Sequence, residues 1–274
     1  MNKSFAFFLF VFFPLFFAAC SSDPEVTWEL VWADEFDGAG KPDTARWNYD
    51  YADGCPAVCG WGNNEQQFYT DDTANARLEN GMLVIEARQE PRGGKPYSSA
   101  RMVTRGKAEW LYGRFEIRAK LSRGKGTWPA IWMLPAENKY GTWPKSGEID
   151  IMEHVGYDPG VVHGTLHSEK YNHLKQTQKE GIIRRKDVQD EFHTYAVEWE
   201  PEYVKFMVDD SVYHQVNHEQ GDDFNGWPFD RKFYLILNQA VGGNWGGKEG
   251  IDSSIWPQRM LVDYVRVYQH PEPR

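Results

Sequence analysis

The sequence predicts an all-β fold in which two antiparallel sheets stack as one sandwich. Short segments with alternating apolar and polar residues recur along the chain, and turn residues separate them. No amphipathic helix of useful length interrupts this pattern, and many short strands without helices are typical of a sandwich or a barrel. No Pro- or Ser-rich linker and no internal repeat divides the 274 residues. We therefore expect one domain, spanning residues 27–270.

The segment 114–121 shows the alternation most clearly. Phe115, Ile117, Ala119 and Leu121 share one face of the expected strand, and charged residues occupy the other. The other main segments expected to form strands are 82–88, 161–166, 194–200, 203–208, 211–215, 233–240 and 260–268.

The N-terminus has the features of an export signal. Lys3 precedes an uncharged and mostly apolar run at residues 5–19, which is too short to span a bilayer comfortably. The run ends at Phe17-Ala18-Ala19-Cys20, which resembles a bacterial lipobox. This resemblance implies a lipoprotein signal peptide at residues 1–19, lipidation of Cys20 and a polar tether at residues 20–26. The alternative is a secreted protein that is cut near Ala19.

The charge and hydropathy of the chain limit the classes of partner that it can bind. A formal net charge of −10 argues against nucleic-acid binding, which needs basic patches. No other segment could cross a membrane, so membrane contact is expected only through the lipid anchor.

Cys55 and Cys59 are close in an exported chain, which favours a disulfide. Zinc binding is the weaker alternative, because no histidine lies nearby.

One acidic segment, Glu148-Ile149-Asp150-Ile151-Met152-Glu153, points to chemistry. Its apolar residues lie between acids, which predicts a strand with Glu148 and Asp150 on one face. Glu153 would point the other way unless a β-bulge near Met152 returned it to that face. The alternative is an ordinary solvated strand with its acids outward.

With the bulge, the segment would place three carboxylates on one exposed face. Two carboxylates about 5–5.5 Å apart are the catalytic groups of a retaining glycosidase. Asp150, between them, could orient Glu148 by a hydrogen bond. Acids this close titrate as a coupled set, so one can stay protonated near neutral pH while another is charged.

The chain resembles glycoside hydrolase family 16. Residues 147–153 resemble the signature of that family in its bulged form. Further matches follow in the family's order at residues 32–38, 61–65, 127–135, 163–167, 192–199 and 262–268. The resemblance implies a concanavalin A-like β-jelly-roll of two antiparallel sheets, with a substrate cleft across the concave one. Within the family, the chain is most similar to bacterial laminarinases and β-1,3(4)-glucanases.

The resemblance also implies roles for the three acids. Glu148 would be the nucleophile, Asp150 its orienting partner and Glu153 the general acid/base. The implied reaction is endo-acting, retaining hydrolysis of β-1,3-glucan or of mixed-linkage β-1,3-1,4-glucan, and it needs no catalytic cofactor.

Aromatic residues make up 15% of the chain, with 12 Trp, which is more than a core requires. Exposed aromatic rings are natural partners for the apolar faces of sugars. Trp128, Trp132 and Trp143 are therefore candidate subsite walls, although Trp132 fits a core position equally well. Further candidate substrate contacts are Asn64, Arg101 and Trp245.

His163 and His167 share a face of their strand, which would also suit a metal pair. The sequence offers no third ligand, so we expect His167 near the acid/base, bonded to substrate or to Glu153. A structural histidine is the alternative.

The family resemblance implies a structural calcium ion far from the chemistry, held by Glu35, the carbonyl of Gly81 and Asp263. Oxygen-only ligands suit calcium. Simple salt bridges of these acids are the alternative.

Two other functions fit the same fold. One is a carbohydrate-binding lectin, which would not need a close acid trio. The other is a hydrolase of algal galactans, which the neutral or acidic surroundings of the site disfavour for sulfated substrates. For the whole protein we expect a monomeric lipoprotein of the bacterial outer membrane or cell surface, with secretion or a periplasmic location as alternatives.

Overall fold

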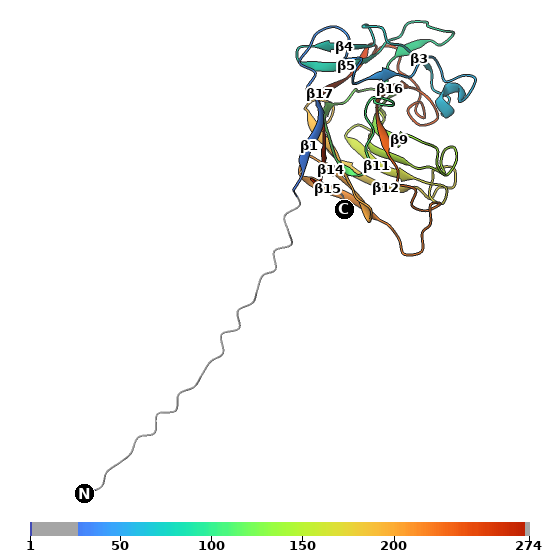
Figure 1. The fold of residues 1–274 in the computed structure, drawn as a ribbon. Coiled ribbons are helices and arrows are strands. Elements are labelled where there is room, and N and C mark those ends of the chain that lie inside the picture. The colour runs from blue at the N-terminus through green and yellow to red at the C-terminus, as the bar shows by residue number, and fades with distance from the viewer. Residues whose placement is uncertain (2–26, 272–274) are drawn as a thin grey trace.

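The computed structural model describes Met1 and residues 27–271, and this part is built almost entirely of strands (Figure 1). The expected signal peptide, Cys20 and tether lie outside the described residues. Two large antiparallel sheets are present, so the predicted all-β sandwich is confirmed. No helix in the described part is long and apolar enough to cross a membrane.

The first sheet has eight strands and includes the first and last strands of the chain. Strand β1 pairs with β17 alone, beside the main path of the sheet. In order, its strands are β15 (Ser211–Asn217), β14 (Tyr203–Val208), β13 (His193–Trp199), β8 (Gly113–Lys120), β17 (Gln258–Gln269), β5 (Met82–Ala87) and β4 (Ala76–Glu79), with β1 (Glu29–Asp34) beside β17.

The second sheet has seven strands and carries the acidic segment on β10. Figure 1 shows β9, β11 and β12 of this sheet on the opposite side of the domain from β1, β14 and β15. In order, its strands are β12 (Lys179–Arg184), β11 (Val161–His167), β10 (Glu148–Glu153), β9 (Thr127–Pro135), β16 (Phe233–Val241), β7 (Arg101–Val103) and β2 (Asn48–Tyr49).

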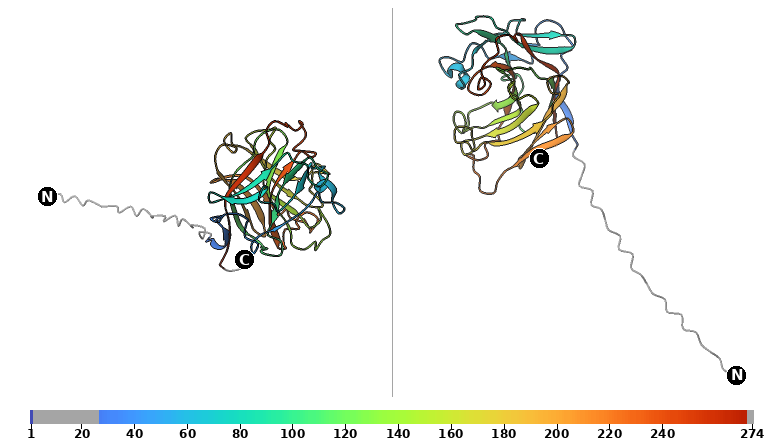
Figure 2. Two further views of the ribbon diagram at one scale, coloured as in Figure 1. Left: turned by 90° about the horizontal axis from the view of Figure 1, so that it is seen from above. Right: turned by 180° about the vertical axis from the view of Figure 1, so that it is seen from behind.

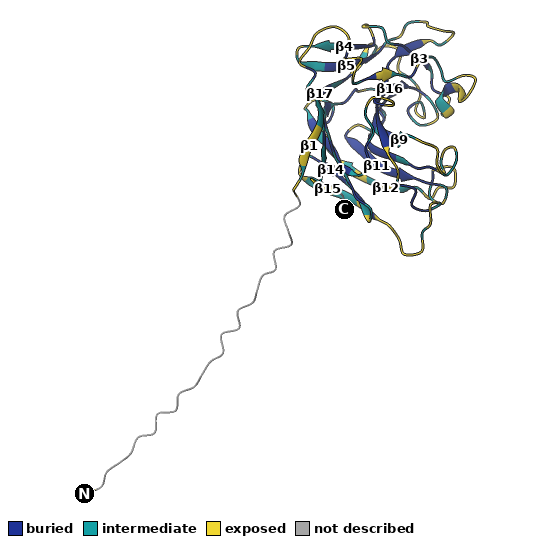
Figure 3. Cartoon of the chain, viewed as in Figure 1, coloured by how far each residue is buried: buried dark blue, intermediate teal, exposed yellow. Residues whose placement is uncertain are grey.

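A single large core lies between the two sheets. Phe115 and Ile117 of β8 pack there with Met133 of β9, Ile149 of β10 and Leu235 of β16, and none of them is exposed. Burial of each such side chain contributes about 1.5–3 kcal/mol to stability. In Figure 3 strands such as β9 and β11 are largely dark blue, whereas β1 is mostly exposed or intermediate.

The seven-stranded sheet has a second apolar layer on its outer face. Tyr234 and Ile236 of β16 pack there with Val103 of β7, and Trp132 and Leu134 of β9 cover them. All nine residues of β16 are therefore buried, because the strand has a packed layer on each side. This outer layer forms the surface of the sheet next to the acidic segment of β10.

A disulfide closes the loop that approaches the outer face of this sheet. It joins Cys55 and Cys59, whose Cα atoms are 4.2 Å apart. The short 3₁₀ element η1 (Cys59–Gly62) follows at once, and the parallel pair β3 (Gln67–Tyr69) and β6 (Tyr97–Ser99) lies beyond it. Two further views show the strands as one continuous body (Figure 2).

Candidate active site

Strand β10 contains the predicted bulge. Against β9, Asp150 pairs with Trp132 while Met152 pairs with Ile131, so Ile151 has no partner of its own. Ile151 and Met152 are consecutive, yet both are buried in the core. Two successive inward side chains shift the alternation by one residue. Glu153 therefore returns to the face that Glu148 and Asp150 occupy.

Strand β11 presents a matching row to the three acids. In the antiparallel register, Glu148 lies opposite His167, Asp150 opposite Thr165 and Glu153 opposite His163. Directly paired residues of neighbouring strands have side chains on the same face. The acids and the two histidines thus line one surface of the seven-stranded sheet.

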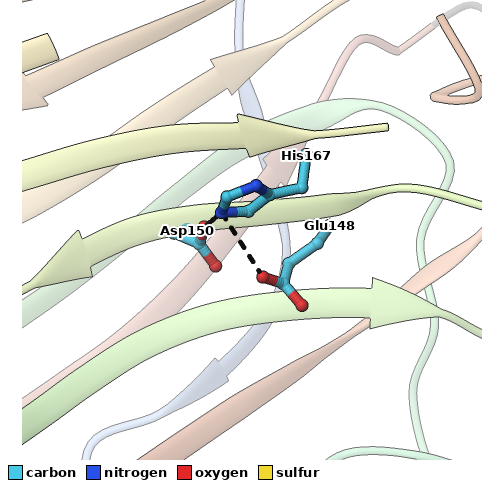
Figure 4. A group of neighbouring side chains, drawn as sticks. All are labelled: Glu148, Asp150 and His167. Carbon is cyan, nitrogen blue, oxygen red and sulfur yellow. Dashed lines mark ion pairs between the residues drawn. The ribbon is translucent and has the colours of Figure 1, made fainter. Parts of the chain in front are cut away.

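Glu148 is held by two ring systems. The indole Nε1 of Trp143 donates a hydrogen bond of 3.0 Å to Glu148 Oε2. The ring Nε2 of His167 lies 3.7 Å from Glu148 Oε1 (Figure 4). Because both groups favour the charged carboxylate, they support a nucleophile at this position.

Asp150 shares this face with Glu148 and is almost completely buried, with 2% of its surface exposed. Its Oδ2 is 3.3 Å from the same Nε2 of His167, and Figure 4 shows the imidazole ring serving both carboxylates. Burial raises the pKa of Asp150 well above its ordinary value, and the negative charge of Glu180 adds to this effect. Asp150 is therefore suited to hold a proton beside the other two acids.

Glu153 receives its hydrogen bond from Trp128, whose Nε1 donates to Glu153 Oε1 over 3.0 Å. The ring of Trp128 is only 9% exposed and packs edge-on against Trp245, with ring centres 5.4 Å apart. A buried ring cannot form the open platform that the sequence suggested for Trp128. Its place in the structure is that of a side chain that orients Glu153.

The environment of the acid trio favours its protonated forms. Burial raises the pKa of both Glu148 and Glu153 to about 8, and the charge of Asp150 acts in the same direction. His167 opposes the shift at both glutamates, and the N–H donors of Trp143 and Trp128 oppose it at their respective partners. Three carboxylates this close cannot all be charged. The site is therefore built to keep a proton near neutral pH.

His167 makes its ion pairs with Asp150 and Glu148, and its charge also lowers the pKa of Glu153. Its expected contact with substrate or with Glu153 stays a prediction. His163 is the residue opposite Glu153, and its Nδ1 lies 2.8 Å from Glu180 Oε1. A metal could find three ligand atoms in the described part at Glu148, Asp150 and His167, all within 4.8 Å of one another.

Arg101 and Trp132 form one cluster further along the sheet. The guanidinium of Arg101 lies between the rings of Trp61 and Trp132, 4.4 and 4.7 Å from their centres, and its Nε is 3.0 Å from Asp50. Trp132 donates from Nε1 to Asn238 Oδ1 over 2.7 Å. Because Trp132 pairs with Asp150 across the strands, this cluster continues the surface that carries the acids.

The other expected contacts lie on loops around the acids. Asn64 is exposed and donates to Asn244 over 2.8 Å, which brings its loop beside that of Trp245. Trp143 is 36% exposed, and its ring centre lies 5.1 Å from that of His173. Of the candidate tryptophans, Trp143 therefore presents an open ring next to Glu148.

Two residues of this surface, Asp50 and Glu180, were missed from the sequence, and Trp61 was part of the matched segment 61–65 without being named as a contact. Asp50 follows the two-residue strand β2, and Trp61 lies in η1 with a positive φ of 52°. Glu180 lies on the edge strand β12, opposite Thr165. No local pattern marks Asp50 or Glu180, because only the order of the strands brings them to the site.

The expected calcium ligands lie around β17 in the eight-stranded sheet. Glu35 follows β1, Gly81 precedes β5, and both strands pair with β17, where Asp263 interrupts the regular register. In the structure Glu35 accepts two hydrogen bonds of 2.8 Å from Arg266, and Asp263 is paired with Arg118. The oxygen ligands fit calcium chemistry, but both carboxylates bind guanidinium groups here. Calcium binding stays a prediction.

Comparison with known proteins identifies the family. The model of glycosyl hydrolases family 16 matches residues 58–266. A beta-glucanase of Rhodothermus marinus is 54% identical over 92% of this chain and 88% of its own, and a glucan endo-1,3-beta-glucosidase of Cryptopygus antarcticus is 44% identical over 93% and 96%. The X-ray structure of the Rhodothermus marinus laminarinase superposes with a TM-score of 0.87 at 53% identity, covering 90% of this chain and 100% of that one. The chain therefore belongs to glycoside hydrolase family 16 and is a glycoside hydrolase.

Proposed function

We propose that the protein cleaves internal bonds of β-1,3-glucan such as laminarin, of mixed-linkage β-1,3-1,4-glucan, or of both, with retention of configuration. The observation that carries this proposal is the bulge in β10, which leaves Glu148 and Glu153 on one face with Asp150 between them. The names of the relatives support a β-glucan as substrate.

In the first step, Glu148 attacks the anomeric carbon while Glu153 protonates the leaving glycosidic oxygen. This step needs a charged Glu148 and a protonated Glu153. Burial raises the pKa of both glutamates to about 8, so the shifts alone do not assign the two roles, which follow the family motif. Close carboxylates lose their protons in separate steps, so one of the pair can be charged while the other keeps its proton.

In the second step, the covalent glycosyl-enzyme is hydrolysed. Glu153, which has now lost its proton, acts as a base and activates a water molecule at the same anomeric carbon. Glu148 leaves as a carboxylate, and Glu153 regains its proton. Two inversions at one carbon give net retention.

Product analysis with matched variants tests the roles of the three acids. We expect Glu148→Gln and Glu153→Gln to lose nearly all turnover of laminarin, and Asp150→Asn to lose less but still a large part. Proton NMR of the first product should show the β-anomer. Near-wild-type rates in either glutamine variant, or an inverted first product, would refute the mechanism.

A panel of polysaccharides tests the substrate. Laminarin, barley β-glucan, lichenan and agarose should be digested separately and the products separated by chromatography. We expect a ladder of oligosaccharides from one or more of the three glucans, as endo-cleavage requires. Cleavage of agarose alone would favour the galactan hydrolase, and binding of laminarin without cleavage would favour the lectin.

We also propose that the protein is a monomeric lipoprotein, anchored through Cys20 at the outer membrane or cell surface. The support is the lipobox-like segment at Phe17-Ala18-Ala19-Cys20. Labelling with a fatty-acid probe and cell fractionation should find the protein in membranes, and Cys20→Ala should abolish the label. An unlabelled wild-type protein in the medium or the periplasm would support the alternative locations.

A further inference from the structure

We propose that the β2 edge of the seven-stranded sheet carries a second sugar-binding site, which holds a distant glucose ring of the same glucan chain that is cleaved at Glu148 and Glu153. This inference rests on the proposed function and adds that long glucan chains are bound at a second place, which short ones cannot reach. A cavity of about 420 Å³ opens at this edge. Its lining includes Lys41, Asn48, Tyr49, Tyr51, Asp71 and Arg105.

The cavity lies at the end of a row that begins at the catalytic acids. Across the strands, Asp150 pairs with Trp132, Trp132 with Ile236, Ile236 with Val103, and Val103 with Asn48. Each pair shares one face of the sheet, so this row reaches the cavity at Asn48. Tyr49 packs toward the core between the sheets, so the cavity continues around the edge of the sheet. Four strand spacings of about 4.8 Å place Asn48 about 19 Å from Asp150, which is several sugar rings away.

Arg105 connects the cavity with the surface between. It lines the cavity, and its guanidinium lies 5.2 Å from the ring centre of Tyr234 on the outer face of β16. Its Nη1 also donates to the Tyr234 hydroxyl over 3.1 Å. A chain that leaves the acids across Trp132 would therefore pass Tyr234 and Arg105 before it reaches the cavity.

Aromatic rings supply the apolar surface that a sugar needs. Tyr51 is 55% exposed, and its ring centre lies 6.2 Å from that of Tyr49. Trp47 also lines the cavity but is only 1% exposed, so Tyr51 supplies the open ring. The C–H faces of a glucose ring stack on surfaces of this kind.

The polar groups of the cavity suit neighbouring sugar hydroxyls. Lys41 Nζ and Asp71 Oδ2 lie 3.2 Å apart and offer a donor beside an acceptor.

The experiment compares a long and a short substrate. We expect Tyr51→Ala to lower kcat/KM for laminarin about three- to tenfold, mainly through KM, because one stacking contact is lost. A β-1,3-linked oligosaccharide of three glucose rings is too short to reach the cavity, so its kcat/KM should stay unchanged. Leu30→Ala, at an equally exposed position on the other sheet, is the matched control and should change neither value.

Equal losses on both substrates, or no loss on laminarin, would overturn the second site. A binding measurement separates this outcome from failure of the proposed function. Laminarin should bind the inactive Glu148→Gln variant, and adding Tyr51→Ala should weaken that binding several-fold. If laminarin is bound in this way but never cleaved by the wild-type protein, the proposed function is wrong and the second site stands.

Discussion

Each catalytic glutamate has its own indole donor, and the two donors should control opposite limbs of the pH profile. In Trp143→Phe, Glu148 loses an N–H donor that lowers its pKa. Because Glu148 must be charged to attack, the acid limb of kcat/KM should move to higher pH. A lost hydrogen bond of about 1.4 kcal/mol to a charged group corresponds to about one pH unit. A pH series with a short oligosaccharide measures the shift.

Trp128→Phe is the matched comparison, because it removes the donor to Glu153 instead. The pKa of Glu153 should rise, and since Glu153 acts as an acid, the alkaline limb should move to higher pH while the acid limb stays in place. If both variants move the same limb, the assignment of nucleophile and acid/base to these two positions is wrong.

Because side chains alternate along strand β10, inserting or deleting one residue before Glu153 decides to which face of the sheet Glu153 points. One extra alanine between Met152 and Glu153 should turn Glu153 toward the core and lower the rate to that of Glu153→Gln. Deletion of Ile151 should instead give regular alternation with Glu153 still outward, and should keep measurable activity. Loss of a buried side chain of this size costs about 2–5 kcal/mol, so thermal unfolding of both variants must be followed beside the rate on laminarin. An active insertion variant contradicts the argument.

Strands β1, β5 and β17 bring the expected calcium ligands together, and stability is the property to measure. Millimolar Ca²⁺ should raise the melting temperature and EDTA should lower it, because a ligand that binds only the folded state stabilises that state. Glu35→Gln should remove this response. Glu116→Gln also breaks an ion pair with an arginine of the same sheet, but it should leave the response intact. An unchanged melting temperature in the wild type would mean that Glu35 and Asp263 serve as ion-pair partners only.

At the scale of the whole molecule, local alternation was enough to find most of the long strands, but not short strands such as β2, β4 and β7 or the edge strand β12. The segment 203–208 coincides with β14, and 260–268 lies inside the longer β17. The bulge was also predictable, because the acids reveal which residues must face outward. Asp50 and Glu180 were not predictable, since strand order alone brings them to the site. The burial of Trp128, which rules it out as an open platform for a sugar, was also not predictable. The sequence shows that a tryptophan is present, but not that neighbouring loops enclose it.

Residue 27, to which the proposed lipid anchor would connect, and the catalytic acids lie on different sheets, which predicts how the proposed membrane attachment would affect catalysis. The described chain begins beside β1 of the eight-stranded sheet, where the Trp28 ring stacks on that of His270 at 4.1 Å. The acids lie on the outer face of the other sheet. We therefore expect lipidated protein in vesicles and protein starting at residue 27 to have equal kcat/KM on a short soluble oligosaccharide. A lower value for the vesicle-bound form alone would mean that the membrane covers the site.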